Sequence, residues 1–215
     1  MDLKKLMEGN QNLVLLIPNK HYPDALVEIA RDLAERNESI CYVSINKPSE
    51  SIKKAFVKEG IDESKFYFID CISRTITHKE EELDGKAKER TIFIDGPHSL
   101  TQLSLELFNI IEREKIEGIL FDCISTLLIY NEEKDVMRFV HHMMSKIKKT
   151  NTKVIYPYLK EDTDSKIVKE MGLFADKIVE MGEKEIKKKA SKKEPIKEEK
   201  IKKQRLDSFE EIIIK

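Results

Sequence analysis

The turn Pro18–Asp24 is the first place in the chain where side chains could do chemistry. It follows a continuous apolar run, Asn12–Pro18, and precedes an amphipathic segment. Such a strand–turn–helix unit can bind phosphate through backbone N–H groups at the start of the helix. The turn offers Asn19, Lys20 and His21, and Lys20 with His21 could make a weak anion contact. It has no glycine, however, and its two prolines stiffen the backbone.

A second position of interest is Asp122, which ends the apolar run Gly118–Asp122 and is closely followed by Ser125. A carboxylate at the end of a buried strand could hold a water ligand of Mg²⁺. The alternative is structural, because a polar side chain at that place can cap backbone groups of neighbouring strands. Since the turn after the first apolar run lacks the usual features of a phosphate site, the sequence favours the capping role.

Histidines and cysteines could in principle bind a metal, but the sequence has neither a CxxC pair nor a matched histidine spacing. His141 and His142 are neighbours on a predicted helix, so they point about 100° apart and cannot hold one ion from one face. His98 follows a strand near the rim where such sheets bind ligands, and both a ligand contact and an ordinary surface position stay open. The three cysteines lie in apolar runs, which indicates buried thiols in a reducing compartment: Cys41, Cys71 and Cys123.

Continuous apolar runs and helical periodicity define the elements that must position these residues. The predicted strands are Asn12–Pro18, Ile40–Ile45, Phe66–Ile69, Thr91–Ile94, Gly118–Asp122, Lys153–Tyr158 and Ile178–Met181. The predicted helices are Ala25–Asn37 with Asp24 as its N-cap, Pro48–Lys58, Leu100–Glu114 with Ser99 as its cap, Lys134–Lys149 and Asp164–Met171. Residues Thr77–Arg90 are polar and charge-rich, and they are predicted to form an exposed excursion.

Strands that are apolar throughout, separated by helices of about a dozen residues, are typical of a parallel sheet covered on both faces. The sequence therefore predicts an α/β domain of three layers with a mostly parallel sheet over residues 1–182. Residues 183–205 read as a lysine-rich linker, with eleven Lys/Arg and five Glu and a net charge of +6. Residues 206–215 form an apolar C-terminal peptide. The formal net charge of the whole chain, −1, argues against general binding of nucleic acid.

Four stretches in this order resemble KaiC-like ATPases of the RecA superfamily. They are "SICYVSINKPSESIKKAFVKEGID", "DGPHSLTQLSLELFNIIEREKIEGILFDCISTLL", "VMRFVHHMMSKIKKTNTKVIYPY" and "GLFADKIVEM". The first is similar to the family's second strand and following helix, and the second to the section that ends in the Walker B strand. The last two are similar to the closing helix and strands. The resemblance runs from about residue 12 to 182 and implies a RecA-like fold, with Asp122 at the Walker B position.

The departures from that family concern its chemistry. Its phosphate loop resembles GxxGxGKT, whereas this chain has "PNKHYPD" at the matching turn. Asp24 falls near the hydroxyl that binds Mg²⁺ in the family, where a carboxylate would repel phosphate, and Lys20 comes too early in the turn. Asn46 and Lys47 stand where the family tends to carry glutamates that activate water, and neither can act as a general base near neutral pH.

Two functions follow as expectations. The first is a non-catalytic KaiC/RecA-like protein that acts as a regulatory or protein-interaction module without a cofactor. The second is an atypical ATP-binding protein or slow ATPase that uses Mg²⁺, Asp122 and a non-standard phosphate loop. The vestigial nucleotide-binding residues would be Asn19, Lys20, Asp24, Asp122 and Ser125. We expect a protein partner or self-association into a ring or dimer, no nucleic acid and no membrane. The N-terminus has no apolar leader, which predicts a cytoplasmic protein.

The C-terminal peptide is predicted to dock on the α/β body or on a partner, with Phe209, Ile212, Ile213 and Ile214 as its interaction residues. Burying one such side chain stabilises by roughly 1.5–3 kcal/mol, and the entropic cost of a loop of about 25 residues grows only logarithmically with its length. We expect slower amide hydrogen exchange at these residues than at Lys187–Lys193, either in the isolated protein or after a partner is added. If the two sets of residues exchange equally fast, both in the isolated protein and with a partner, the C-terminal peptide does not dock.

Overall fold

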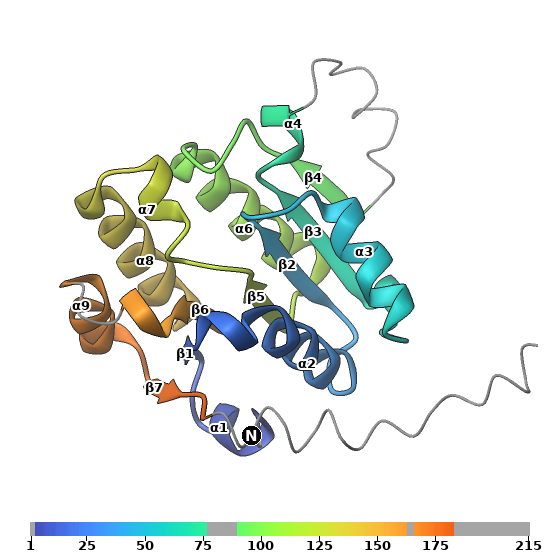
Figure 1. Ribbon diagram of the computed structural model, residues 1–215, viewed down its shortest axis with the longest axis horizontal. Helices are drawn as coiled ribbons and strands as arrows, with labels where there is room; N and C mark the ends of the chain where they lie inside the picture. Colours follow the sequence, from blue (N-terminus) through green and yellow to red (C-terminus); the bar gives the residue numbers. More distant parts are fainter. Residues whose placement is uncertain (1–2, 77–89, 163–165, 183–215) are drawn as a thin grey trace, which may run out of the picture. The chain divides into compact units, whose positions relative to one another are not determined.

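A seven-stranded parallel sheet organises the computed structural model, which describes residues 3–76, 90–162 and 166–182 (Figure 1). The strands run in the order β4-β3-β2-β5-β6-β1-β7, and the pairings between them are parallel. Their bounds are β1 Asn12–Ile17, β2 Ile40–Ser44, β3 Phe66–Asp70, β4 Thr91–Phe93, β5 Gly118–Phe121, β6 Lys153–Leu159 and β7 Lys177–Glu180. The predicted α/β fold with a parallel sheet is confirmed.

Helices cover both faces of this sheet (Figure 1). The longer helices are α2 Tyr22–Ala34, α3 Ser49–Lys58, α6 Leu100–Glu114, α8 Glu133–Ile147 and α9 Lys166–Phe174. The short ones are α1 Leu3–Met7, η1 Asn19–His21, η2 Glu63–Lys65, α4 Ser73–Ile76, α7 Leu127–Tyr130 and η3 Lys160–Asp162. Among the helices of the described residues, none combines the length and the apolar character needed to cross a bilayer.

The two faces bury different side chains of the same strands, which is why the strands are apolar throughout. On one face, Val43 belongs to a buried cluster with Leu103 and Leu107 of α6 and with helices α8 and α9. Its neighbour Tyr42 points to the other face and packs against Phe56 of α3, with 5.7 Å between the ring centroids. Successive side chains of one strand therefore point into two different buried cores, rather than alternately into a core and into solvent.

The cysteines are buried and free, as the sequence predicts. Cys41 and Cys71 are fully covered, and Cys123 is 2% exposed. Burial raises the pKa of the Cys41 and Cys71 thiols, which keeps both protonated and unreactive at neutral pH.

The prediction that Asp24 caps the first helix is wrong. The helix begins three residues earlier than predicted, at Tyr22, and His21 is its N-cap. The reason is the short turn η1, in which the His21 N–H donates to Pro18 O at 2.9 Å and the chain enters the helix at once. Asp24 is then an exposed residue of the first turn, where its carboxylate complements the helix dipole.

Other boundaries shift by a few residues, and three short α-helices of the described residues were not predicted from the sequence. The helix α2 ends at Ala34 rather than Asn37, α8 covers Glu133–Ile147, and the last strand covers Lys177–Glu180. Ser99 precedes α6 as predicted, but its side chain makes no capping hydrogen bond. The unpredicted α-helices are α1, α4 and α7, each too short to show a helical period.

Several predictions lie outside the described residues. They are the polar excursion at 77–89, the start of the helix predicted at Asp164, the lysine-rich linker 183–205 and the C-terminal peptide 206–215 with Phe209, Ile212, Ile213 and Ile214. The chain divides into two units, Met1–Gly182 and Glu183–Lys215, and the fold described above is that of the first.

Candidate functional site

The C-terminal ends of the parallel strands meet at one edge of the sheet, where open α/β sheets bind their ligands. The polar residues that follow β1, β2, β3, β5 and β6 gather there, and together they are called the strand-end site below. They are Asn19 and Lys20, Asn46 and Lys47, Asp70, Asp122 and Ser125, and Glu161.

The turn after β1 already uses the backbone N–H groups of Asn19, His21 and Tyr22. The Asn19 N–H donates to both carboxylate oxygens of Glu161, at 3.1 Å each. The His21 N–H donates to Pro18 O, and the Tyr22 N–H donates to Asn19 O. Pro23 has no N–H to offer. The Glu161 carboxylate, which follows β6 and is 142 residues away in sequence, thus binds the first N–H group of the turn that leads into α2.

Asp122 is buried at the end of β5, with 2% of its surface exposed. One carboxylate oxygen, Oδ2, accepts the Asn46 N–H at 2.9 Å, and its main-chain oxygen accepts the Tyr22 hydroxyl at 2.9 Å. The other oxygen, Oδ1, has no hydrogen-bond partner within the described residues. Burial raises the pKa of Asp122 to about 7, while the Asn46 N–H and the nearby Lys47 ammonium act against this rise.

Ser125 and Asn46 tie neighbouring connections to each other. The buried Ser125 Oγ accepts the Leu159 N–H at 3.1 Å, which joins the end of β5 to the end of β6. The Asn46 side-chain oxygen accepts the Thr126 hydroxyl at 2.6 Å, while its N–H binds Asp122. Asn46 therefore links β2 to the connection after β5, a contact that no sequence pattern predicted.

Asp70, at the end of β3, is the residue that sequence reasoning missed most clearly. Its side chain is fully buried and accepts four hydrogen bonds. Oδ1 accepts the N–H groups of Ile72 and Ser73 at 2.9 and 2.8 Å, and Oδ2 accepts the Ser49 N–H and the Ser73 hydroxyl at 2.7 Å each. It thereby holds the starts of α3 and α4. The available signal was its position, because it ends a strand just as Asp122 does.

The sequence-predicted site residues are only partly brought together. Tyr22 connects the turn after β1 to Asp122, and a hollow of about 500 Å³ is lined by both Ser125 and Glu161. The side chains of Asn19 and Lys20 are exposed beside that turn. Asp24 is exposed in the first turn of α2.

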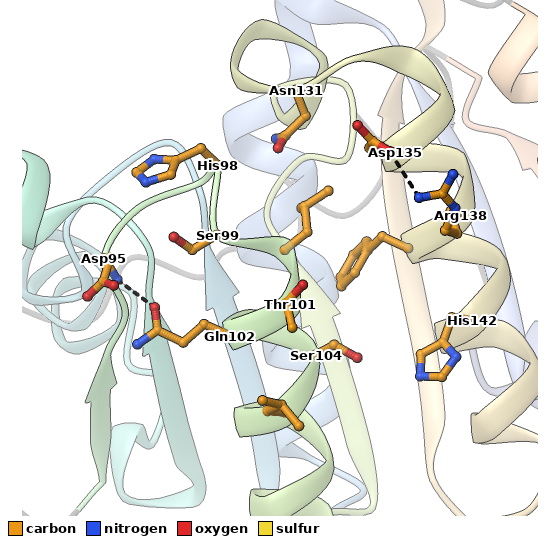
Figure 2. A pocket seen from close by; sticks show the side chains of 13 residues that line it. Asp95, His98, Ser99, Thr101, Gln102, Ser104, Asn131, Asp135, Arg138 and His142 are labelled. Atoms are coloured by element: carbon orange, nitrogen blue, oxygen red, sulfur yellow. Dashed lines mark hydrogen bonds and ion pairs between the residues drawn. The ribbon is translucent and has the colours of Figure 1, made fainter.

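The histidines lie elsewhere. His98 and His142 line a cleft of about 830 Å³ between α6 and α8 (Figure 2). His141 instead stacks on Phe174, with 4.0 Å between the ring centroids, while His142 meets the edge of Phe108. The two neighbouring histidines thus contact different rings. Within residues 3–76, 90–162 and 166–182, no group of three or more His, Cys, Asp or Glu side chains could hold a metal ion.

Comparison with solved structures supports the fold. The chain resembles a KaiC-like protein from the hyperthermophilic archaeon Pyrococcus horikoshii OT3, with a TM-score of 0.55 and 10% sequence identity. The match covers 80% of this chain and 72% of that protein. At this identity the likeness shows the fold alone, which is that of KaiC-like and RecA-like α/β domains.

Comparison with sequences gives the family. A search of curated proteins finds no match. The model of a family described as "Family of unknown function (DUF7504)" matches residues 20–181, which is most of the chain and includes the strand-end site apart from Asn19. The chain therefore belongs to the DUF7504 family.

Proposed function

We propose that this protein is a non-catalytic member of the KaiC/RecA-like group that acts as a regulatory or protein-interaction module. The proposal rests on the strand-end site, because nucleotide chemistry in this fold would need that edge. The domain would retain the sheet and its helices, and its surface rather than its strand ends would carry the function.

The observation that carries this proposal is the contact between Glu161 and the turn after β1. A bound phosphate needs backbone N–H groups that point at it and are free to donate. Here the Asn19 N–H faces a carboxylate, and those of His21 and Tyr22 bond within the turn. A phosphate would have to displace a like-charged group. These residues do not fit a bound nucleotide phosphate.

The residues after β2 support the same proposal. Asn46 and Lys47 are exposed, and neither is a carboxylate that could activate water. The Asn46 N–H and side chain are engaged with Asp122 and Thr126. The Lys47 ammonium is near Asp122 and favours the ionised form of that carboxyl, although burial still raises its pKa.

A protein partner, or self-association into a dimer or ring, is the corresponding proposal for what the module binds. Large apolar side chains exposed on three helices support it: Leu105 on α6, Ile129 on α7 and Leu173 on α9, at 61%, 77% and 76%. Exposed apolar groups of this size are more typical of contact with other proteins than of contact with nucleic acid.

We expect no hydrolysis of Mg-ATP above a buffer blank and no stabilisation of the full-length protein by Mg-ATP. A specific binder would gain about 2.7 kcal/mol at a ligand concentration 100 times its dissociation constant. The measurements are phosphate release and thermal melting, with Asp122→Ala as the control. Turnover or stabilisation that disappears in Asp122→Ala would overturn the proposal, whereas turnover that persists in that variant would identify a contaminating enzyme.

One observation favours the second candidate, an atypical nucleotide binder. The Oδ1 atom of Asp122 is buried without a hydrogen-bond partner in the described part of the chain, and such an atom could accept a cation or its water ligand. Stabilisation of the protein by Mg-ATP, but not by ATP with a chelator, would support this candidate. The same shift in both conditions would point to an anion effect unrelated to Asp122.

A further inference from the structure

The hollow of about 500 Å³ beside helix α7, called the α7 hollow below, borders the strand-end site and shares Ser125 and Glu161 with it. One wall is formed by Ser125, Thr126 and two residues of α7, and the other by the end of β6 and by η3. Two segments that are distant in sequence therefore form one concave surface.

Hydrogen bonds fix the two walls of the α7 hollow. The Leu159 N–H donates to Ser125 Oγ at 3.1 Å, which joins one wall to the other. The Thr126 hydroxyl donates to the Asn46 side-chain oxygen at 2.6 Å, and the Ile129 N–H donates to Thr126 O at 3.0 Å, so the start of α7 is held as well. A surface that already has its shape needs little ordering when a partner binds.

The hollow has an apolar part that is open to solvent. Leu128 and Leu159 line it and are half-buried, and Ile129 lines it with 77% of its surface exposed. Leu127, which begins α7, points inward and is fully buried. Because a helix turns by about 100° per residue, Ile129 faces the opposite way, toward solvent. A partner that covered Ile129 would bury apolar surface that folding leaves exposed.

The charged residues of the described lining are both acidic. They are Glu161 and Asp162, and both are exposed. Glu161 accepts hydrogen bonds from the uncharged N–H of Asn19. Neither carboxylate forms an ion pair with a lysine, arginine or histidine of residues 3–76, 90–162 or 166–182. The hollow therefore combines apolar side chains with negative charge that this part of the chain does not neutralise.

The neighbouring lysines and the uncharged polar groups of the hollow are already engaged. Lys160 precedes the two carboxylates in sequence, but its ammonium pairs with Glu180 at 2.5 Å. Lys20, next to Asn19, likewise interacts with another residue, and so does Tyr158 of the lining. What the hollow offers to a partner is therefore its apolar surface and its two carboxylates.

We propose that the α7 hollow binds a segment of another protein in which lysine or arginine stands next to large apolar side chains. The apolar side chains would cover Leu128, Ile129 and Leu159, and the cations would face Glu161 and Asp162. Carboxylates repel phosphate groups, so neither nucleic acid nor an anionic lipid surface suits this hollow. The inference rests on the protein-interaction function proposed above and gives the chemistry of the partner.

The experiment is a titration of the full-length protein followed by ¹H–¹⁵N NMR. The probes are three peptides with blocked ends, LKLKL, LELEL and SKSKS. We expect LKLKL to shift the amide signals of Thr126, Ile129 and Leu159, with a dissociation constant on the order of 1 mM or tighter. LELEL carries the wrong charge and SKSKS lacks the apolar side chains, so each should bind about tenfold more weakly or not at all.

Variants separate the hollow from general effects of charge and hydrophobicity. Ile129→Ser should weaken the binding of LKLKL about tenfold, because it removes the most exposed apolar side chain of the lining. Asp162→Asn should weaken it by roughly two- to threefold, as expected for an ion pair at the surface. The matched controls are Leu173→Ser on α9 and Glu112→Gln on α6, which change exposed residues of the same kinds outside the hollow.

Several results would overturn the proposal. They are the absence of any shift at these amides, binding of LELEL or SKSKS as tight as that of LKLKL, and a control variant that weakens binding as much as its counterpart does. Changes at the same amides on dilution without peptide would identify a second copy of the chain as the occupant, and changes caused by Ile213→Ser would identify the C-terminal peptide. Either result would also exclude a separate partner. The expected lack of ATP turnover depends on none of these results, so the two proposals can fail separately.

Discussion

Replacement of Asp70 by asparagine is expected to destabilise the fold by about 3–5 kcal/mol, the cost of breaking a buried, fully hydrogen-bonded charge. The carboxylate accepts four hydrogen bonds and is completely buried. Asparagine keeps one acceptor oxygen but places an NH₂ group where the other was, opposite the Ser49 N–H and the Ser73 hydroxyl. At least one buried donor then faces another donor, and the start of α3 loses its anchor.

Urea denaturation of the full-length protein measures this change. The matched control is Asp62→Asn, because Asp62 also caps a helix start by accepting from Ser64, but it does so at the surface. The control should shift the midpoint much less than Asp70→Asn does. Equal midpoints for the two variants would mean that the hydrogen bonds of Asp70 contribute no more than those of an exposed cap.

The second large effect is a pH dependence of stability that comes from Asp122. Burial raises its pKa from the ordinary 3.8 to about 7 in the folded protein. The unfolded chain therefore releases this proton at lower pH than the folded protein does. The contribution of the protonated carboxyl is complete below pH 3.8, declines as the pH rises and is lost above about pH 7. A shift of this size corresponds to about 4 kcal/mol.

The variant Asp122→Asn isolates this contribution, because an amide does not titrate and the other ionisable groups are common to both proteins. We expect the wild type to lose about 4 kcal/mol relative to Asp122→Asn between pH 4 and pH 8. The measurement is the difference between their unfolding free energies in urea at several pH values. A constant difference over this range would show that Asp122 ionises at its ordinary pKa, and a difference of opposite sign would show that the folded protein favours the charged form.

Most of the fold could be predicted from the sequence, because the signals are local. The continuous apolar run Ile40–Ile45 predicted the buried strand β2, and the periodic Leu103, Leu107, Ile110 and Ile111 predicted α6, with those residues in the core. The burial of Cys41, Cys71 and Cys123 followed from the same runs. These properties depend on which face of an element is apolar, and a stretch of about ten residues contains that information.

The candidate site could be predicted only in outline. The sequence located the turn after β1 and the end of β5, and it singled out Asn19, Lys20, Asp122 and Ser125 by their positions. The start of α2 was predicted wrongly, because it depends on the turn η1, which is set by the backbone conformation at Pro18 after β1. The same local rules treated Asp70 as the end of a strand and gave no weight to its carboxylate.

Tertiary structure alone decided which partners these polar groups have. Glu161 meets Asn19 across 142 residues of sequence, the Tyr22 hydroxyl meets Asp122 across 100, and Asn46 meets Asp122 across 76. No local pattern encodes such pairs, because they arise only when the strand order brings the ends of β1, β2, β5 and β6 to the same edge. The sequence by itself thus determined the strands, the helices and their buried faces. The hydrogen-bond partners at the strand ends, and with them the pKa of Asp122, were set by the order in which the strands assemble, since burial and partners depend on neighbours that are distant in the chain.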